Sequence, residues 1–181
     1  MRLVLLDRDG VLNEDRADYV KNPSELVLIP GVGEAIAHLN GAGIKVAIVS
    51  NQSAVGRGII SPTMLEQINQ RLTSELAKAG ARIDLFLVCT DAPETPSQRR
   101  KPAPGMLREA LSHFRISPSE AVMIGDQLTD LEAAKAAGVA RFLVRTGKGA
   151  HTQAKGLTQD ILPVAIYNSL MEAAVSLVPK A

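Results

Sequence analysis

The sequence is poor in aromatic residues and in cysteine, and both shortages narrow what the protein can do. It has no Trp, two Tyr and three Phe among 181 residues, which argues against the aromatic platforms that stack nucleobases. Its single cysteine, Cys89, excludes an internal disulfide framework and is typical of proteins from a reducing compartment. We therefore expect a cytoplasmic protein.

Charge of one sign and long apolar runs are also missing. The net charge is +1, so no broad electrostatic field attracts nucleic acid or an anionic membrane. No apolar run reaches the length that spans a bilayer, and the strand-like start with an acid at Asp7 does not read as a signal peptide. We expect one domain over residues 1–181, a monomer, with a small-molecule partner and neither nucleic acid nor membrane.

Strand-like and helix-like segments alternate along the chain, which predicts an α/β fold with a doubly wound parallel sheet. Between the strands, apolar residues recur at helical spacing, and Ser61-Pro62 has the pattern of a helix start. Thr129 and Glu132 fit a capping box for a later helix. Short apolar runs predict strands at residues 3–6, 44–49, 83–88, 121–124 and 141–144.

The end of the chain is not predicted to continue the alternation of strands and helices. Beyond Thr146 we expect a Gly- and Lys-containing loop and then a last helix, so that residues 147–181 form a helical tail on a core of residues 1–146. Four apolar residues of this tail are predicted to contact the core: Ile161, Ile166, Leu170 and Leu177.

The first predicted strand ends at Asp7-Arg8-Asp9-Gly10, which places two carboxylates one residue apart at its carboxyl end. In open α/β sheets, ligands bind at that edge. Two acids this close repel each other, so either a cation lies between them or one of them holds a proton. The alternative is an acidic turn that follows an edge strand and has no chemistry.

Other polar residues fall at the ends of neighbouring strands. Ser50 ends the second strand, Lys101 lies in the loop after the third, and Asp126 follows the fourth. Carboxylates, a hydroxyl and a lysine that converge at one sheet edge suit a magnesium-dependent phosphoryl-transfer site, because Mg²⁺ prefers hard oxygen ligands. Taken alone, Ser50 or Lys101 would be unremarkable.

The segment Asp7-Arg8-Asp9-Gly10-Val11-Leu12 resembles motif I of the haloacid dehalogenase superfamily. Ser50 resembles motif II, Lys101 motif III, and Gly125-Asp126 with Asp130 the acids of motif IV. The stretches LDRDGVLN, SNQSAVGRG, RRKPAPGM and MIGDQLTD are similar to those of the heptose 1,7-bisphosphate phosphatases and their relatives, the histidinol-phosphate phosphatases. The resemblance covers residues 1 to about 146 and implies a Rossmann-like fold. The short spacer between Asn13 and Pro30 leaves no room for a large cap domain.

The resemblance implies a role for each matching residue. Asp7 would be the nucleophile that forms an aspartyl-phosphate, and Asp9 the acid and base. The acidic neighbours of Asp9 favour the proton that this role needs, whereas Mg²⁺ opposes it. Ser50 and Lys101 would hold the phosphoryl oxygens, and Asp7, Asp126 and the Asp9 backbone carbonyl would bind Mg²⁺. Contacts to the substrate are expected from Asn51, Gln52, Arg57, Arg100, Asp15, Arg16, Tyr19 and Gln127.

The implied reaction is hydrolysis of the 7-phosphate of D-glycero-D-manno-heptose 1,7-bisphosphate, a step toward lipopolysaccharide core precursors. The sequence departs from this family in two places. Zinc ligands are absent, because Cys89 stands alone, Asp91 takes a histidine position and residues 95–99 contain no cysteine, and one thiolate cannot make a structural zinc site. Gln127 also replaces a lysine that is common in the family.

Three alternatives remain beside this interpretation. Histidinol phosphate or another small sugar phosphate would use the same motifs. A receiver-type signalling domain also accepts phosphate on an aspartate, but its aspartate ends the third strand, where this chain has Val88-Cys89. A non-catalytic binding protein would be expected to have lost one of the four residues Asp7, Asp9, Lys101 and Asp126, and all four are present.

Overall fold

A six-stranded parallel sheet runs through the computed structural model, which describes residues 1–178. The strand order is β3-β2-β1-β4-β5-β6, so β1 lies between β2 and β4. All four residues of β1 are fully buried, as expected for a central strand covered on both faces. The strands are β1 (Leu3–Leu6), β2 (Lys45–Asn51), β3 (Leu85–Cys89), β4 (Ala121–Gly125), β5 (Ala140–Val144) and β6 (Ala165–Tyr167).

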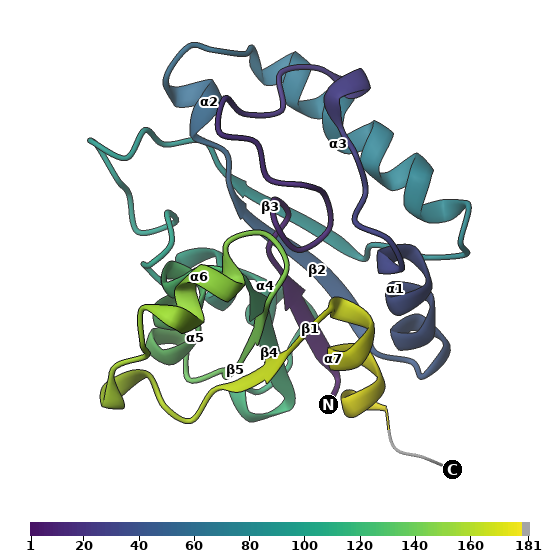
Figure 1. Cartoon of the computed structure of the whole chain (residues 1–181), viewed down its shortest axis with the longest axis vertical. Coiled ribbons are helices and arrows are strands. Elements are labelled where there is room, and N and C mark those ends of the chain that lie inside the picture. Colours follow the sequence, from purple (N-terminus) through teal and green to yellow (C-terminus); the bar gives the residue numbers. More distant parts are fainter. Residues whose placement is uncertain (179–181) are drawn as a thin grey trace.

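Helices cover both faces of the sheet, which confirms the predicted doubly wound α/β fold (Figure 1). One face packs against α1 (Val32–Gly41), α3 (Pro62–Ala77) and α7 (Leu170–Leu177). The other face packs against α4 (Gly105–Phe114) and α5 (Leu128–Ala137). Within residues 1–178, no helix combines the length and apolarity that crossing a membrane would need. Short helices complete the fold: α2 (Ser53–Gly56), α6 (Gly149–Ala154), η1 (Pro23–Glu25), η2 (Pro118–Glu120) and η3 (Gln159–Ile161).

The helix α3 begins and packs as its sequence predicts. The Ser61 hydroxyl accepts a hydrogen bond from the Met64 backbone N–H at 3.1 Å, and proline follows in the first turn. Its apolar stripe is buried against the sheet and the flanking loop, at Leu65, Ile68, Leu72 and Leu76. Full burial of one such side chain contributes about 2 kcal/mol, so this stripe fixes the helix beside β2 and β3.

Two sequence predictions about local structure are wrong. The predicted helical tail of residues 147–181 is not purely helical in its described part, residues 147–178, because β6 extends the sheet beside β5 and Ile166 belongs to that strand; residues 179–181 lie outside the described residues. The capping box at Thr129 and Glu132 is displaced by two residues. The residue before α5 is Gln127, and its backbone N–H is accepted by the Asp130 side chain at 3.0 Å. Asp130 is buried, so it faces the end of the sheet rather than solvent.

Candidate active site

The polar residues predicted at the strand ends meet at one edge of the sheet. Asp7 follows β1, Ser50 lies near the end of β2, Lys101 comes from the loop after β3, and Asp126 follows β4. All four are buried. A cavity of about 320 Å³ opens beside them, lined by Asp7, Arg8, Asp9, Asp15, Arg16, Ala17, Tyr19, Val20, Ser50, Asn51, Gln52, Ser53, Arg100, Lys101, Gln127, Thr129, Asp130 and Lys148.

Lys101 bridges two buried carboxylates. Its Nζ lies 3.0 Å from Asp7 Oδ1 and 2.6 Å from Asp130 Oδ1. Burial acts to lower the pKa of Lys101, but Asp130 and Asp7 outweigh burial and raise it above its usual value. Burial raises the pKa of Asp7 to about 6; Lys101 opposes this rise, and Asp130 and Asp9 add to it. The ammonium group therefore stays charged inside the site.

Asp126 is buried in a pocket that glycine makes possible. Gly10 has a φ of +85°, and a Cβ at this position would lie 2.2 Å from Asp126 Oδ2. That oxygen accepts the Lys148 backbone N–H at 2.8 Å, whereas Asp126 Oδ1 is buried and has no hydrogen-bond partner within residues 1–178. Burial, followed by repulsion from Asp7, raises the pKa of Asp126 to about 8.

These carboxylates have the arrangement of a cation site. One oxygen from each of Asp7, Asp126 and Asp130 lies within 4.8 Å of the other two. The partnerless Asp126 oxygen is costly in a buried place unless a ligand satisfies it. An all-oxygen set suits Mg²⁺ better than zinc, which favours sulfur and nitrogen ligands. The site therefore fits a hard divalent cation.

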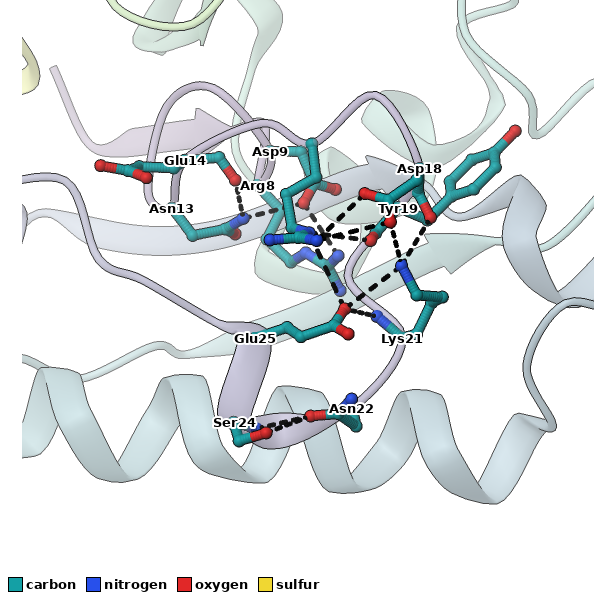
Figure 2. Close-up of polar contacts among 11 residues, drawn as sticks. Arg8, Asp9, Asn13, Glu14, Asp18, Tyr19, Lys21, Asn22, Ser24 and Glu25 are labelled. Atoms are coloured by element: carbon teal, nitrogen blue, oxygen red, sulfur yellow. Dashed lines mark hydrogen bonds and ion pairs between the residues drawn. The ribbon is translucent and has the colours of Figure 1, made fainter.

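The Asp9 side chain turns away from this cluster. Its Oδ1 accepts Arg8 and Asn13 side-chain N–H groups, each at 2.9 Å, and its Oδ2 accepts Gln52 Nε2 at 2.7 Å (Figure 2 shows Arg8, Asp9 and Asn13). Burial acts to raise the pKa of Asp9, but the Arg8 guanidinium and the two amides outweigh burial and lower it. The prediction that acidic neighbours keep a proton on Asp9 is therefore wrong for the free protein.

Two amide residues at the carboxyl end of β2 hold other parts of the site in place. Asn51 makes a pair of hydrogen bonds with the Lys101 backbone: its amide donates to the carbonyl at 2.9 Å, and its oxygen accepts the N–H at 3.0 Å. Gln52 Nε2 also donates to Ser50 Oγ at 3.0 Å. Asn51 and Gln52 line the cavity as predicted, but both are also occupied in holding Lys101, Ser50 and Asp9.

The segment between Asn13 and η1 forms a flap over the cavity. Figure 2 shows Asp18, Lys21 and Glu25 turned toward one another, with the Tyr19 ring directed away from them. Arg16 joins this network, with its guanidinium 3.2 Å from Asp18 and 3.8 Å from Glu25. Tyr19 has a φ of +66°, an unusual conformation for a bulky residue. The predicted residues Asp15, Arg16 and Tyr19 all line the cavity.

The predicted substrate contacts divide into two groups. Arg100 and Gln127 line the cavity, and Arg100 donates to the Asp91 backbone carbonyl at 2.9 Å. Arg57 does not belong to the cavity lining, and its guanidinium lies 2.9 Å from Glu94 in the loop that follows β3. The contact of Arg57 with substrate therefore stays a prediction, because Arg57, unlike Arg100 and Lys148, lies outside the cavity lining.

Two cationic residues of the cavity wall were not singled out from the sequence. Arg8 is buried between Asp7 and Asp9, and nothing in the sequence pattern distinguishes it from a surface arginine. Lys148 follows β5, and its Nζ lies 2.8 Å from Asp15 Oδ2, so that it links the flap to the opposite wall. The sequence position of Lys148 could have predicted its place in the site, because it follows a strand end at the same sheet edge as the other site residues.

The comparisons with known proteins agree with this geometry. A family model described as HAD-hydrolase-like matches residues 98–173. The D-glycero-beta-D-manno-heptose-1,7-bisphosphate 7-phosphatases of Pseudomonas aeruginosa and Pseudomonas putida are each 40% identical to the chain. The first alignment covers 97% of both chains, and the second covers 98% of this chain and 100% of the relative.

Solved structures give the same result. The D,D-heptose 1,7-bisphosphate phosphatase of Bordetella bronchiseptica, complexed with magnesium and phosphate, superposes with a TM-score of 0.93 at 36% identity over 100% of both chains. The corresponding enzyme of Burkholderia thailandensis gives a TM-score of 0.75 at 34% identity, over 99% of this chain and 100% of that one. The chain therefore belongs to the haloacid dehalogenase-like hydrolases and, within them, to the family of the heptose-1,7-bisphosphate 7-phosphatases.

Proposed function

We propose that this protein hydrolyses the 7-phosphate of D-glycero-D-manno-heptose 1,7-bisphosphate through an aspartyl-phosphate on Asp7. The observation that carries the proposal is the buried Asp7–Lys101–Asp130 cluster beside Asp126, at the mouth of a cavity of about 320 Å³. The relatives are heptose-1,7-bisphosphate phosphatases, which supports the identity of the proposed sugar. The phosphate bound by the Bordetella enzyme supports the reaction class.

In this proposal Asp7 attacks phosphorus. Its Oδ1 accepts the Arg8 backbone N–H at 2.7 Å and contacts Lys101, so the carboxylate is oriented at the cavity wall. Lys101 and Ser50 lie beside it and would hold the transferring oxygens, where a fixed cation and a hydroxyl stabilise the developing charge. Asn51 keeps the Lys101 backbone in place through its two hydrogen bonds. Attack breaks the bond from phosphorus to the sugar oxygen and leaves the phosphoryl group on Asp7.

Asp9 would deliver a proton to the departing sugar oxygen and then remove one from the water that hydrolyses the intermediate. In the free protein its donors, Arg8, Asn13 and Gln52, favour the carboxylate. A dianionic phosphate that binds beside this carboxylate raises its pKa. The proton is therefore taken up as the substrate binds, or arrives on the substrate.

Asp7, Asp126 and the Asp9 backbone carbonyl would hold Mg²⁺, with Asp130 close behind them. When bound, Mg²⁺ neutralises the negative charge that the acids and the phosphoryl group bring together. The orphaned Asp126 oxygen supports this assignment. We propose no zinc in the loop after β3, because the single cysteine of the chain is Cys89, the last residue of β3, and residues 90–104 contain no histidine.

The remaining features of the proposal concern the chain as a whole. We take residues 1–181 as a single catalytic domain and the protein as a cytoplasmic monomer. The substrate is then a soluble sugar phosphate, and neither nucleic acid nor membrane takes part. The net charge of +1 supports the proposal that neither nucleic acid nor membrane takes part, because binding to polyanions depends on clustered positive charge.

The experiment that tests the function is phosphate release from a panel of phosphate esters in the presence of Mg²⁺. We expect the heptose 1,7-bisphosphate to give the highest kcat/KM, well above histidinol phosphate and simple monophosphates. Arg100 and Lys148 on the cavity wall favour a second anionic group over the cationic amine of histidinol phosphate. If histidinol phosphate is the faster substrate, the proposed substrate is wrong.

Metal binding is predicted to depend on pH. Asp7 and Asp126 have pKa values of about 6 and about 8 in the fold, against an ordinary value of 3.8. A carboxyl whose pKa is raised on folding binds its proton more tightly in the fold than in the unfolded chain. The metal-free protein should therefore lose stability as pH rises from about 4, until pH passes about 6 for Asp7 and about 8 for Asp126. Mg²⁺ must displace these protons, so its affinity should rise over the same range.

Thermal unfolding with and without Mg²⁺ at several pH values checks this expectation. The increase in Tm caused by a fixed Mg²⁺ concentration should be larger at the alkaline end than at the acid end. The Asp126→Asn variant, which removes one of the two titrating groups, should show a smaller increase. An Mg²⁺ effect that is equally large at every pH would contradict the prediction.

The second phosphate of the substrate is predicted to contact Lys148 and Arg100 rather than Arg57. Lys148 donates to Asp126 through its backbone N–H, so the Lys148→Met variant keeps that contact and removes only the ammonium group. Losing a charged hydrogen bond costs about 1.5–3 kcal/mol. We therefore expect kcat/KM to fall roughly 10- to 100-fold for the bisphosphate, and much less for a monophosphate.

Two variants serve as controls for Lys148→Met. Lys155→Met removes an equivalent charge from an exposed position at the end of α6, outside the cavity lining. Arg57→Ala removes the cation that pairs with Glu94. Both should leave the preference for the bisphosphate unchanged. If Arg57→Ala loses that preference and Lys148→Met does not, the assignment has to be reversed.

A further inference from the structure

Arg8 is a buried cation at the centre of the site. It stands between Asp7 and Asp9 in the sequence, and its side chain is 2% exposed. One terminal nitrogen donates to Asp9 Oδ1 at 2.9 Å, while Nε is buried and has no hydrogen-bond partner among the described residues. With the contact to Asp9 alone, the long Arg8 side chain would keep several rotamers. It would then not hold the Asp9 carboxylate in one orientation.

The other end of the guanidinium is held from a distant part of the chain. Arg8 NH1 donates to Asn69 Oδ1 at 3.2 Å. Asn69 lies in the middle of α3, a helix fixed by the buried Leu65, Ile68 and Leu72. Asn69 itself lines an apolar groove between α3 and β3 rather than the catalytic cavity.

We infer that Asn69 is a positioning residue, which fixes the Arg8 guanidinium and through it the Asp9 carboxylate. The inference rests on the proposed acid–base role of Asp9. Arg8, Asn13 and Gln52 all donate to Asp9, and Arg8 is the one that depends on a second helix for its own orientation. The Asn69 side-chain oxygen is the fixed acceptor that selects one rotamer of this arginine.

Removal of that acceptor leaves the rest of the site intact. The Asn69→Leu variant keeps the number and branching of side-chain heavy atoms and introduces a good helix former, but NH1 of Arg8 then lacks its acceptor. Displacement of a catalytic group by about 1 Å can cost on the order of 100-fold in rate. The loss should fall on the step that needs a proton from Asp9.

The leaving group separates this role from a structural one. Phenolate leaves poorly and needs a proton, whereas p-nitrophenolate leaves readily without one. We expect Asn69→Leu to lower kcat/KM about 10- to 100-fold for phenyl phosphate and by less than about threefold for p-nitrophenyl phosphate. Asn69→Asp, which keeps an oxygen acceptor in place, should stay within about threefold of the wild type for both esters.

Two further variants make the result decisive. Gln70→Leu changes the adjacent residue of the same groove, which makes no hydrogen bond to Arg8 within residues 1–178, and should match the wild type for both esters. Asp9→Asn should show the same leaving-group dependence as Asn69→Leu, with a larger loss. If Asp9→Asn shows this leaving-group dependence and Asn69→Leu does not, the inference about Asn69 is wrong and the proposed role of Asp9 stands. If neither shows it, the proposed role of Asp9 fails and the inference fails with it.

Discussion

The Asp7→Asn variant is expected to lose turnover while the protein stays folded. An amide cannot attack phosphorus, and losing a catalytic nucleophile costs at least about 10⁴-fold in kcat. The introduced amide would keep an oxygen to accept the Arg8 backbone N–H, now 2.7 Å from Asp7 Oδ1, and Lys101 would keep Asp130 at 2.6 Å. Steady-state phosphate release with the heptose bisphosphate measures the loss.

Stability gives an independent check on this variant. In the folded protein, burial raises the pKa of Asp7 to about 6, above its ordinary value of 3.8, so the carboxylate that predominates at neutral pH costs the metal-free fold some stability. A neutral amide avoids that cost, and the Tm of the metal-free variant should equal or exceed that of the wild type. A variant that keeps more than about a hundredth of wild-type kcat would contradict the nucleophile assignment.

The site acids were predictable because each follows a strongly apolar strand. Leu3–Leu6 and Ala121–Gly125 are buried throughout, and their sequences leave little choice of secondary structure. Since parallel strands end at the same edge, Asp7 and Asp126 had to meet there. Their convergence therefore follows from strand order alone.

Side-chain direction was not predictable in the same way. Arg57 and Lys148 are both basic residues in loops after strands, yet one pairs with Glu94 and the other reaches Asp15 across the cavity. Which cation faces the substrate depends on how the flap and the loop after β3 pack. The sequence contains no local pattern for that packing.

The last strand was missed for a related reason. Ala165–Tyr167 has three residues, all half-buried, and it follows Leu162-Pro163. Ile166, Leu170 and Leu177 have a spacing that also fits a helix face, and a run this short has too few residues to show alternation. Pairing with β5, which the sequence alone does not reveal, decides between the two.

The Asp9→Asn variant is expected to lose kcat by roughly 10²–10⁴-fold, because an amide can neither deliver nor accept the proton. Mg²⁺ affinity should change little, since the proposed contact is the Asp9 backbone carbonyl. The new amide oxygen can still face Arg8 and Asn13, which both donate to Asp9 Oδ1. Its nitrogen would face Gln52, whose amide must turn over and present its oxygen instead.

The variant should also be less stable than the wild type, because the buried Arg8 guanidinium loses its anionic partner at 2.9 Å. Leaving a buried charge without its partner costs about 3 kcal/mol when both groups are fully buried, and less here because the Asp9 side chain is 23% exposed. Urea unfolding measures this loss, and Mg²⁺ titration followed by calorimetry measures the metal affinity. Equal, mild losses of kcat in Asp7→Asn and Asp9→Asn would contradict the different roles proposed for the two acids. A large loss of Mg²⁺ affinity in Asp9→Asn would instead place the Asp9 carboxylate itself on the metal.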